Sequence, residues 1–279
     1  MNTALCELEL LRLRKKTSVW FLLLLSIGIG FAISFIILTL QDELLASESI
    51  QVLDQGTGQS LGIQSFFLDL LGRDIASITG KALWFRNFYI IPLLLIYISA
   101  DISMLQSSKL LREMLCQPIT RTEIYLYKMG FLSIISLISL AATIIPTVLI
   151  ASFHLEEWGA WKDLFGGIIL CWISDIALFG MVFALSSVFK TSGSGSTTIL
   201  VLFLLIVEKM ISGFLYFVFF INQDMQEIGD FIYKLMPSSA LSCWSLWSNE
   251  WDWFLIGYLL FFSCAIHIFA MHSFTKQQV

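Results

Sequence analysis

Charged residues are scarce in this sequence. Of its 279 residues, 13% are Asp, Glu, Lys or Arg, whereas soluble domains carry roughly 25%. The chain also has only four prolines and three histidines, while 57% of its residues are hydrophobic and the mean hydropathy is +0.83. Whole stretches of about twenty residues lack any charge, which excludes an ordinary soluble fold and predicts helices that face lipid.

Sequence signatures of catalysis are absent as well. The chain has no phosphate-binding loop that ends in Gly-Lys-Ser or Gly-Lys-Thr, no His-Glu-x-x-His and no Gly-x-Ser-x-Gly. Its five scattered cysteines offer no disulfide framework, and its net charge of −5 weighs against nucleic acid as a partner. We therefore expect no enzyme activity and no cofactor in this chain.

Six apolar windows are long enough to cross a membrane core of about 30 Å as helices. They lie near residues 18–40, 85–102, 124–151, 165–189, 198–220 and 253–271. Residues 1–17 place leucines among acidic and basic residues, a pattern typical of a helix that lies along the headgroups. The predicted fold class is an all-α polytopic membrane protein, in which residues 1–279 form one transmembrane domain with an N-terminal interfacial elbow helix.

A second interfacial helix is expected in the segment between the first two spans. Apolar residues recur there at helical spacing. They are Ile63, Phe66, Phe67, Leu70, Leu71, Ile75 and Ile78.

The distribution of charge predicts the orientation of the chain. Basic residues cluster before the first span and between the second and third spans, and they follow the fourth and sixth spans. The intervening segments 41–84, 152–164 and 221–252 are predominantly acidic. Because cytoplasmic loops carry an excess of Lys and Arg, both termini are expected in the cytoplasm.

A leucine-rich, basic segment lies between the second and third spans. Its apolar residues Leu110, Leu111, Met114 and Leu115 share one face of a short helix that Pro118 ends. The basic residues on its solvated side are Lys109, Arg112 and Arg121. Such a helix is suited to press against a cytoplasmic partner. The alternative is a helix on anionic lipid, where each Lys or Arg contributes about 1 kcal/mol.

This segment resembles the cytoplasmic loop of type-2 ABC (ATP-binding cassette) transporter permeases, in which a leucine-rich helix is followed by Pro, a spacer and Arg. The similar run extends from Leu111 to Arg121, with Lys128 seven residues on. The run at 9–16 before a span that contains Trp20 is similar to the elbow helix of that family, and the six-span layout is similar too. The chain departs from the family at its usual Gly-Thr pair, where Lys109 and Leu110 stand.

The resemblance implies a multi-pass permease subunit in a bacterial cytoplasmic (inner) membrane, embedded in lipid and without an ATPase site of its own. A separate ATPase, with its ATP and magnesium, would grip the coupling loop, and a second copy or a homologous permease would complete a dimer. The task implied is export of a hydrophobic, amphipathic or lipid-linked substrate, or transmission of force across the membrane. The residues implied in coupling are Lys109, Leu111, Arg112, Leu115, Pro118 and Arg121.

Three ionisable residues fall inside predicted spans: Asp175, Glu208 and Lys209. A charge at a helix centre costs about 2.5 to 3.5 kcal/mol, so these side chains should face the bundle and be paired. Counted from the turn between the fourth and fifth predicted spans, Asp175 and Lys209 lie at depths that allow them to pair. Glu208 would then be protonated or bonded across a subunit interface, because adjacent residues on a helix point in different directions. Their role is either a structural lock between spans or a polar part of the substrate route or dimer axis.

A stripe of Cys264, His267 and Met271 on the last span has the spacing of soft metal ligands, which would suit copper. Three such residues on one helix more often pack within a bundle, so no metal site is expected. Two other functions stay open beside the permease. One is an ATP-independent secondary transporter that uses Asp175, Glu208 and Lys209 as an ion relay. The other is a membrane scaffold that transports nothing.

Overall fold

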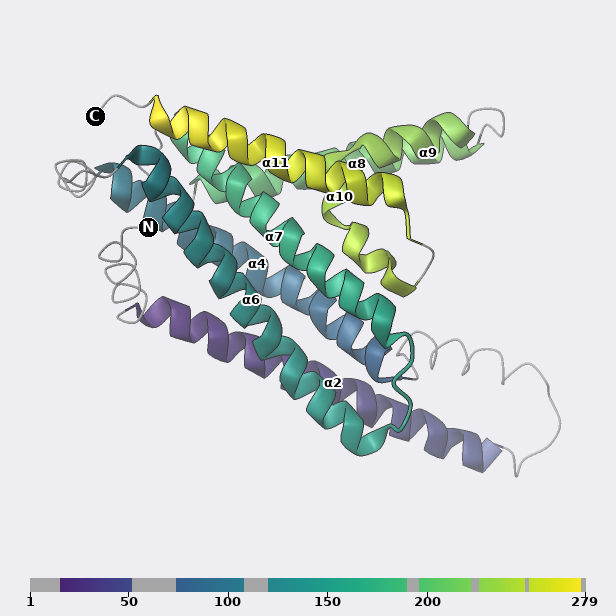
Figure 1. Ribbon diagram of the computed structural model, residues 1–279. Helices are drawn as coiled ribbons and strands as arrows, with labels where there is room; N and C mark the ends of the chain where they lie inside the picture. The colour runs from purple at the N-terminus through teal and green to yellow at the C-terminus, as the bar shows by residue number, and fades with distance from the viewer. Residues whose placement is uncertain are drawn as a thin grey trace.

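The computed structural model describes residues 16–51, 74–107, 120–189, 196–221, 226–248 and 251–276. Every regular element in these ranges is helical, which confirms the predicted all-α class (Figure 1). The elements are α2 (Thr17–Gln51), α4 (Ile75–Ser107), α6 (Arg121–His154), α7 (Trp161–Phe189), α8 (Ser196–Ile221), α9 (Gln226–Leu235), α10 (Pro237–Leu241), the 3-10 helix η2 (Cys243–Ser248) and α11 (Trp253–Thr275).

Each of the six predicted spans lies within one of these helices. Five helices in the described ranges, α2, α4, α6, α7 and α11, are long and apolar enough to cross a membrane. This architecture is that of a multi-pass membrane protein. Helix α8 coincides with the remaining predicted span.

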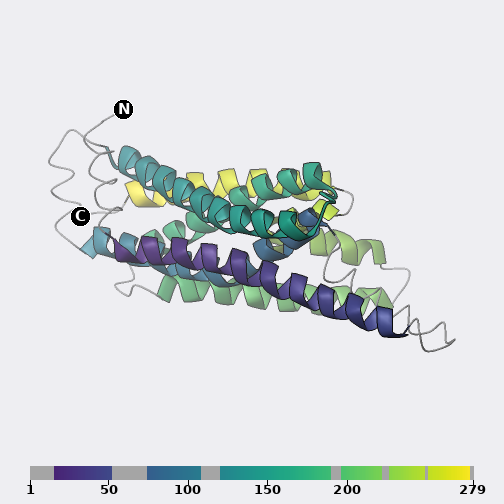
Figure 2. The same ribbon diagram turned by 90° about the horizontal axis from the view of Figure 1, so that it is seen from below.

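The long helices run side by side as one bundle. Helix α2 packs along α6 and α4, and α11 packs along α7 on the other side of the bundle (Figure 1, Figure 2). Helix α8 packs against α4, α7 and the short amphipathic α9. Near the start of α8, the hydroxyl of Thr198 donates to the carbonyl oxygen of Leu95 at 2.8 Å, which ties α8 to α4.

Small residues bring α2 close to α6. A Cβ atom at Gly30 would collide with the carbonyl oxygen of Thr143, so only glycine fits there. The hydroxyl of Thr147 donates to the carbonyl oxygen of Gly30 at 3.3 Å, and the hydroxyls of Ser26 and Ser139 lie 2.9 Å apart. Close approach of small residues is a common way for helices to associate in membranes, where the hydrophobic effect does not drive them together.

Charged contacts hold one end of the bundle. The carboxylate of Asp101 in α4 pairs with the ammonium groups of Lys16, directly before α2, and Lys128 in α6, each at 2.5 Å. At the first residue of α6, the guanidinium of Arg121 donates to the carbonyl oxygen of Thr275 in α11 at 3.3 Å. The start of α2, the start of α6 and the end of α11 therefore lie together.

The second span begins earlier than the sequence predicts. Helix α4 starts at Ile75, and the backbone amide of Ile75 donates to the carbonyl oxygen of Glu157 at 3.1 Å. Asp74 accepts from the amide of Ser77 at 2.7 Å, which satisfies another free amide of the first turn. Ile75 and Ile78 are 1% and 0% exposed, so their predicted place in an interfacial helix is wrong. The other residues of that predicted helix, and residues 1–15 of the predicted elbow, lie outside the described ranges.

Candidate functional site

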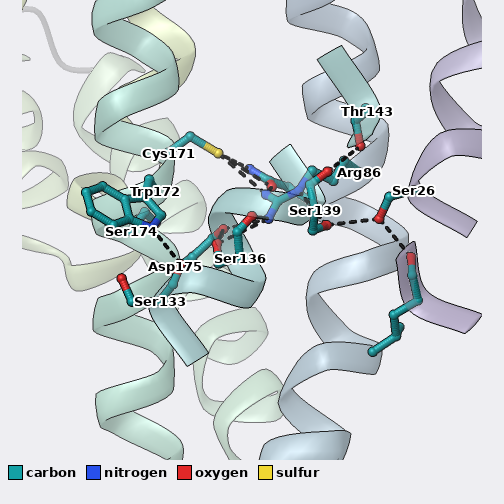
Figure 3. A network of polar contacts seen from close by, with 12 residues as sticks. Ser26, Arg86, Ser133, Ser136, Ser139, Thr143, Cys171, Trp172, Ser174 and Asp175 are labelled. Atoms are coloured by element: carbon teal, nitrogen blue, oxygen red, sulfur yellow. Dashed lines mark hydrogen bonds and ion pairs between the residues drawn. The ribbon is translucent and has the colours of Figure 1, made fainter. Parts of the chain in front are cut away.

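A polar network lies in the middle of the bundle (Figure 3). Arg86 in α4 donates from Nη2 to Oδ2 of Asp175 in α7 at 2.7 Å, and the two side chains are 0% and 2% exposed. The hydroxyl of Ser136 in α6 donates to the same oxygen at 2.5 Å. One carboxylate oxygen thus joins three helices.

The guanidinium of Arg86 is satisfied on its other sides as well. Its Nη1 donates to Oδ1 of Asn87 at 2.7 Å, and its Nε donates to the hydroxyl of Ser139 at 3.3 Å. Because Ser139 also contacts Ser26, the network extends from α7 through α4 and α6 to α2 (Figure 3). A buried charge needs partners of this kind, since desolvating it without them costs several kcal/mol.

A cavity of about 550 Å³ opens beside the ion pair, a size within the range of small-molecule sites. Residues of α4, α7, α8, α9, α10 and η2 line it, and it is open to the surface on one side. Its lining combines aromatic, aliphatic, hydroxyl and charged side chains, with Asp175 and Lys209 both among them. The structure therefore brings two of the three predicted intramembrane ionisable residues to one cavity.

The predicted pairing of Asp175 with Lys209 is corrected by the structure, because the ion pair of Asp175 is made with Arg86. The physical reason is the early start of α4. A helix that begins at Ile75 carries Arg86 roughly three turns into the bundle, to the level of Asp175, whereas a span that begins at 85 would leave this arginine at the interface.

Glu208 finds its partner within the chain. Its Oε1 accepts the backbone amide of Ser238 at 2.9 Å, in the first turn of α10. The free amides of a helix start suit a carboxylate, so no bond across a subunit interface is needed to satisfy Glu208.

The predicted soft-ligand stripe is occupied by packing contacts. Nε2 of His267 lies 3.1 Å from the carbonyl oxygen of Ile176, which can only accept, so Nε2 carries the proton. Nδ1 of His267 then accepts from the hydroxyl of Tyr125 at 2.6 Å. Both nitrogens are used, and the side chain of Cys264 is exposed. Among the described residues, no group of three or more His, Cys, Asp and Glu is placed to hold a metal ion.

Only one of the predicted coupling residues, Arg121, lies in the described part of the chain; Lys109, Leu111, Arg112, Leu115 and Pro118 lie outside it. Thr120 caps α6 in a capping box, in which the amide of Glu123 donates to the Thr120 hydroxyl at 3.2 Å and the amide of Thr120 donates to Oε2 of Glu123 at 2.8 Å. Arg121 itself stabilises the end of α11 through the carbonyl oxygen of Thr275.

No family model, curated protein or solved structure matches this chain.

Sequence reasoning missed Arg86 and Ser136. A usable signal was present for Arg86, because Ile75, Ile78 and Ala82 precede it at helical spacing and would have extended the span toward the N-terminus. Ser136 offered no such signal, since a serine in an apolar span is unremarkable until its neighbours are known. What the assembled site offers chemically is binding: an ammonium, a buried carboxylate and aromatic faces around one cavity.

Proposed function

We propose that this chain is the membrane-embedded permease subunit of an ABC transporter, with ATP hydrolysis on a separate ATPase chain. The observation that carries the proposal is the cluster of Lys16, Asp101 and Lys128. Asp101 precedes and Lys128 follows the run from Leu111 to Arg121 that resembles a coupling loop, and Lys16 directly precedes α2. A force applied to this segment would therefore be passed to α2, α4 and α6 together.

The proposed orientation places this end of the bundle in the cytoplasm of a bacterium and α8 as the sixth crossing. Basic residues at this end support it: Lys16, Arg121, Lys128 and Lys276. Acidic residues lie at the starts of α4 and α11 and around the start of α7: Asp74, Glu156, Glu157, Asp163 and Asp252. An excess of Lys and Arg is the mark of the cytoplasmic side.

The proposed subunit works as a dimer and moves an amphipathic or lipid-linked substrate. The cavity beside Asp175 supports this class of substrate, because its lining is apolar on some sides and charged on others. Large apolar side chains are exposed along α8, among them Phe203, Ile206 and Met210, and form a surface for lipid or for the second permease.

Copurification with an ATPase encoded beside this chain tests the proposal. The purified complex should hydrolyse ATP, and Arg112→Glu should reduce ATPase association about tenfold or more while leaving the thermal midpoint of the chain unchanged. Arg121 is not substituted in this test. Its guanidinium donates to the carbonyl oxygen of Thr275, so a substitution there would also disturb the packing of α6 against α11. Lys162→Glu, an exposed charge reversal at the start of α7, is the matched control. Retained association in Arg112→Glu, or equal loss in Lys162→Glu, would contradict a docking role for the basic segment.

One observation favours a second candidate, a gradient-driven transporter. The ion pair of Arg86 and Asp175 adjoins the cavity, where a proton or cation could be exchanged with a substrate. This candidate predicts transport by the purified chain alone in liposomes under an ion gradient, whereas the permease proposal predicts no transport without the ATPase.

A further inference from the structure

We propose that the cavity beside Asp175 binds a single-chain amphiphile whose head carries both an anionic group and an ammonium group. Naming this ligand as the transported substrate rests on the proposed function, whereas its binding to the chain does not.

Lys209 supplies the position for the anionic group. It lines the cavity from α8, and its ammonium has three N–H donors on a flexible stem. The neighbouring Glu208 does not line the cavity and accepts the amide of Ser238 instead. A phosphate or carboxylate at Lys209 would form a charge-assisted hydrogen bond, which is stronger than a neutral one.

Asp175 supplies the position for the ammonium group. Within the described chain its hydrogen bonds from Arg86 and Ser136 both end on Oδ2, and Oδ1 has no donor there. The residue is 1% exposed, yet it lines the cavity. This oxygen can accept a donor from the cavity, and an ammonium group there would provide one.

The serines of the lining strengthen this assignment. The hydroxyls of Ser174, Ser242 and Ser245 donate to the carbonyl oxygens of Leu241, Ser238 and Ser242 at 2.7, 2.9 and 2.8 Å. With their protons engaged by backbone, these hydroxyls offer lone pairs as acceptors. This part of the cavity therefore suits a donor and disfavours a second anion.

Aromatic side chains surround the same space. They are Trp84, Phe88, Tyr233 and Trp244. The face of an aromatic ring attracts a cation, so these rings add to the position for the ammonium group. An anion alone would leave both the rings and Oδ1 of Asp175 unused.

The apolar wall of the cavity has room for an alkyl chain. It is formed by Ile91, Leu178, Leu205 and Ile206, with Phe88 beside them. Phe88 in α4 and Ile206 in α8 are 61% and 59% exposed, so the wall continues onto the outer surface of the bundle. An alkyl chain can thus lie partly in the cavity and partly in the bilayer, with its head at the charged side chains.

Binding is tested on the full chain, purified in a nonionic maltoside detergent, by quenching of tryptophan fluorescence. Three probes share a dodecyl chain with a terminal bromine and differ in the head: a phosphoethanolamine ester, a phosphate and an amine. The phosphoethanolamine probe should quench saturably and bind about tenfold more tightly than either of the others, since each of those loses one charged contact. Trp84→Phe and Trp244→Phe should each reduce the saturable quenching, because these rings line the cavity.

Lys209→Gln should weaken both phosphate-bearing probes about tenfold and leave the amine probe unchanged, and Lys209→Arg should restore binding. Lys162→Gln, an exposed lysine outside the cavity, is the control and should bind like the wild type. Phosphoethanolamine without an alkyl chain should fail to displace the probe, since the apolar wall would then be empty.

The inference would be overturned by quenching that does not saturate, by tighter binding of the amine than of the phosphoethanolamine probe, or by equal affinity in the wild type and Lys209→Gln. If phosphoethanolamine without an alkyl chain displaced the probe, the ligand would be a free head group and not an amphiphile. That result would also overturn the inference. Loss of the ATPase partner with saturable binding retained would refute the proposed function alone. An ATPase complex that shows no saturable binding would refute this inference alone.

Discussion

The guanidinium of Arg86 and the carboxylate of Asp175 meet at 2.7 Å with almost no exposed surface, one from α4 and the other from α7. An unpaired charge at this depth in the bilayer costs several kcal/mol, so each side chain offsets the cost of burying the other. The hydroxyl of Ser136 adds α6 to the contact. The pair is therefore both a link between helices and one wall of the cavity that Asp175 lines.

Removal of one partner of this ion pair should be costly. We expect Asp175→Asn to lower the free energy of unfolding by about 3 to 5 kcal/mol, because Arg86 would remain buried without a counter-charge. The double variant Arg86→Met, Asp175→Leu should be more stable than Asp175→Asn, since it removes both charges. Denaturant unfolding in detergent measures both, with the exposed Glu156→Gln as control. An Asp175→Asn chain as stable as the wild type would contradict the structural role.

Two neighbouring glycines of α2 should respond differently to alanine. At Gly30 a Cβ would collide with the carbonyl oxygen of Thr143, whereas at Gly28 no atom lies within 4 Å. Gly30→Ala should lower the free energy of unfolding by about 1 to 3 kcal/mol, because α2 must move away from α6. Gly28→Ala should leave it unchanged or raise it by up to about 1 kcal/mol, since alanine favours the helix. Equal effects of the two substitutions in thermal unfolding would refute the close approach at Gly30.

The start of α11 should make stability depend on pH in the acid range. The hydrogen bond from Lys234, at 2.7 Å in the ion pair, is the main cause of a lowered pKa for Asp252, and the amides of Phe254 and Leu255 contribute. Because the folded pKa lies below the unfolded value of about 3.9, the stabilisation is complete above that pH and is lost as the pH falls through the folded pKa.

The loss of stability between pH 6 and pH 3 should therefore be larger for the wild type than for Asp252→Asn. The asparagine amide keeps the N-cap of α11 but carries no titrating charge. Thermal midpoints at the two pH values measure the difference, and an equal loss in both proteins would show that the pair with Lys234 contributes nothing.

Cys243 in η2 should resist alkylation in the folded protein. Burial raises the pKa of its thiol to about 11, with a further contribution from the charge of Asp252. Relative to an ordinary thiol, this lowers the thiolate fraction at neutral pH about a hundredfold. Ser245→Cys, at an exposed position of the same short helix, should react with a maleimide at the ordinary rate. Comparable rates at the two positions would contradict the burial of Cys243.

Cysteine labelling also tests the orientation proposed for the chain. In a background with the five native cysteines replaced by serine, Glu157→Cys should react with an impermeant maleimide on intact cells. Lys276→Cys should react only after permeabilisation. Both positions are exposed, so the difference reports the side of the membrane. The reverse pattern would place the basic segment at 108–119 outside the cell and refute coupling to a cytoplasmic ATPase.

The positions of the long helices could be predicted because they depend on local properties of the chain. A predominantly apolar stretch such as 124–151 has to form a helix in lipid, where backbone amides find no water, and α6 covers it. The ends of helices were harder to predict. The first amides of α4 donate to the carboxylate of Asp74 and to the carbonyl oxygens of Glu157 and Trp158, and the latter two are distant in sequence.

Part of the candidate site was accessible from the sequence and part was not. The cost of burial marked Asp175 and Lys209 as residues that need partners, and both line the cavity. Their predicted pairing failed because Asp175 pairs with Arg86 of α4, whose depth in the bundle depends on where α4 begins. The partner of Glu208 is the backbone amide of Ser238, which carries no charge and so could not be found by searching the sequence for opposite charges.

By itself, the sequence determined the all-helical, membrane-protein class of the chain, the approximate extents of most long helices in the described ranges, and which side chains could not remain alone in a membrane. These follow from the length and apolarity of each segment and need no knowledge of its neighbours. Only the tertiary structure decided that Arg86 meets Asp175, that Asp101 joins Lys16 to Lys128, and that a cavity lies between α4, α7 and α8. Such contacts depend on which helices are adjacent and on their relative depth, and both are set by packing over the whole bundle.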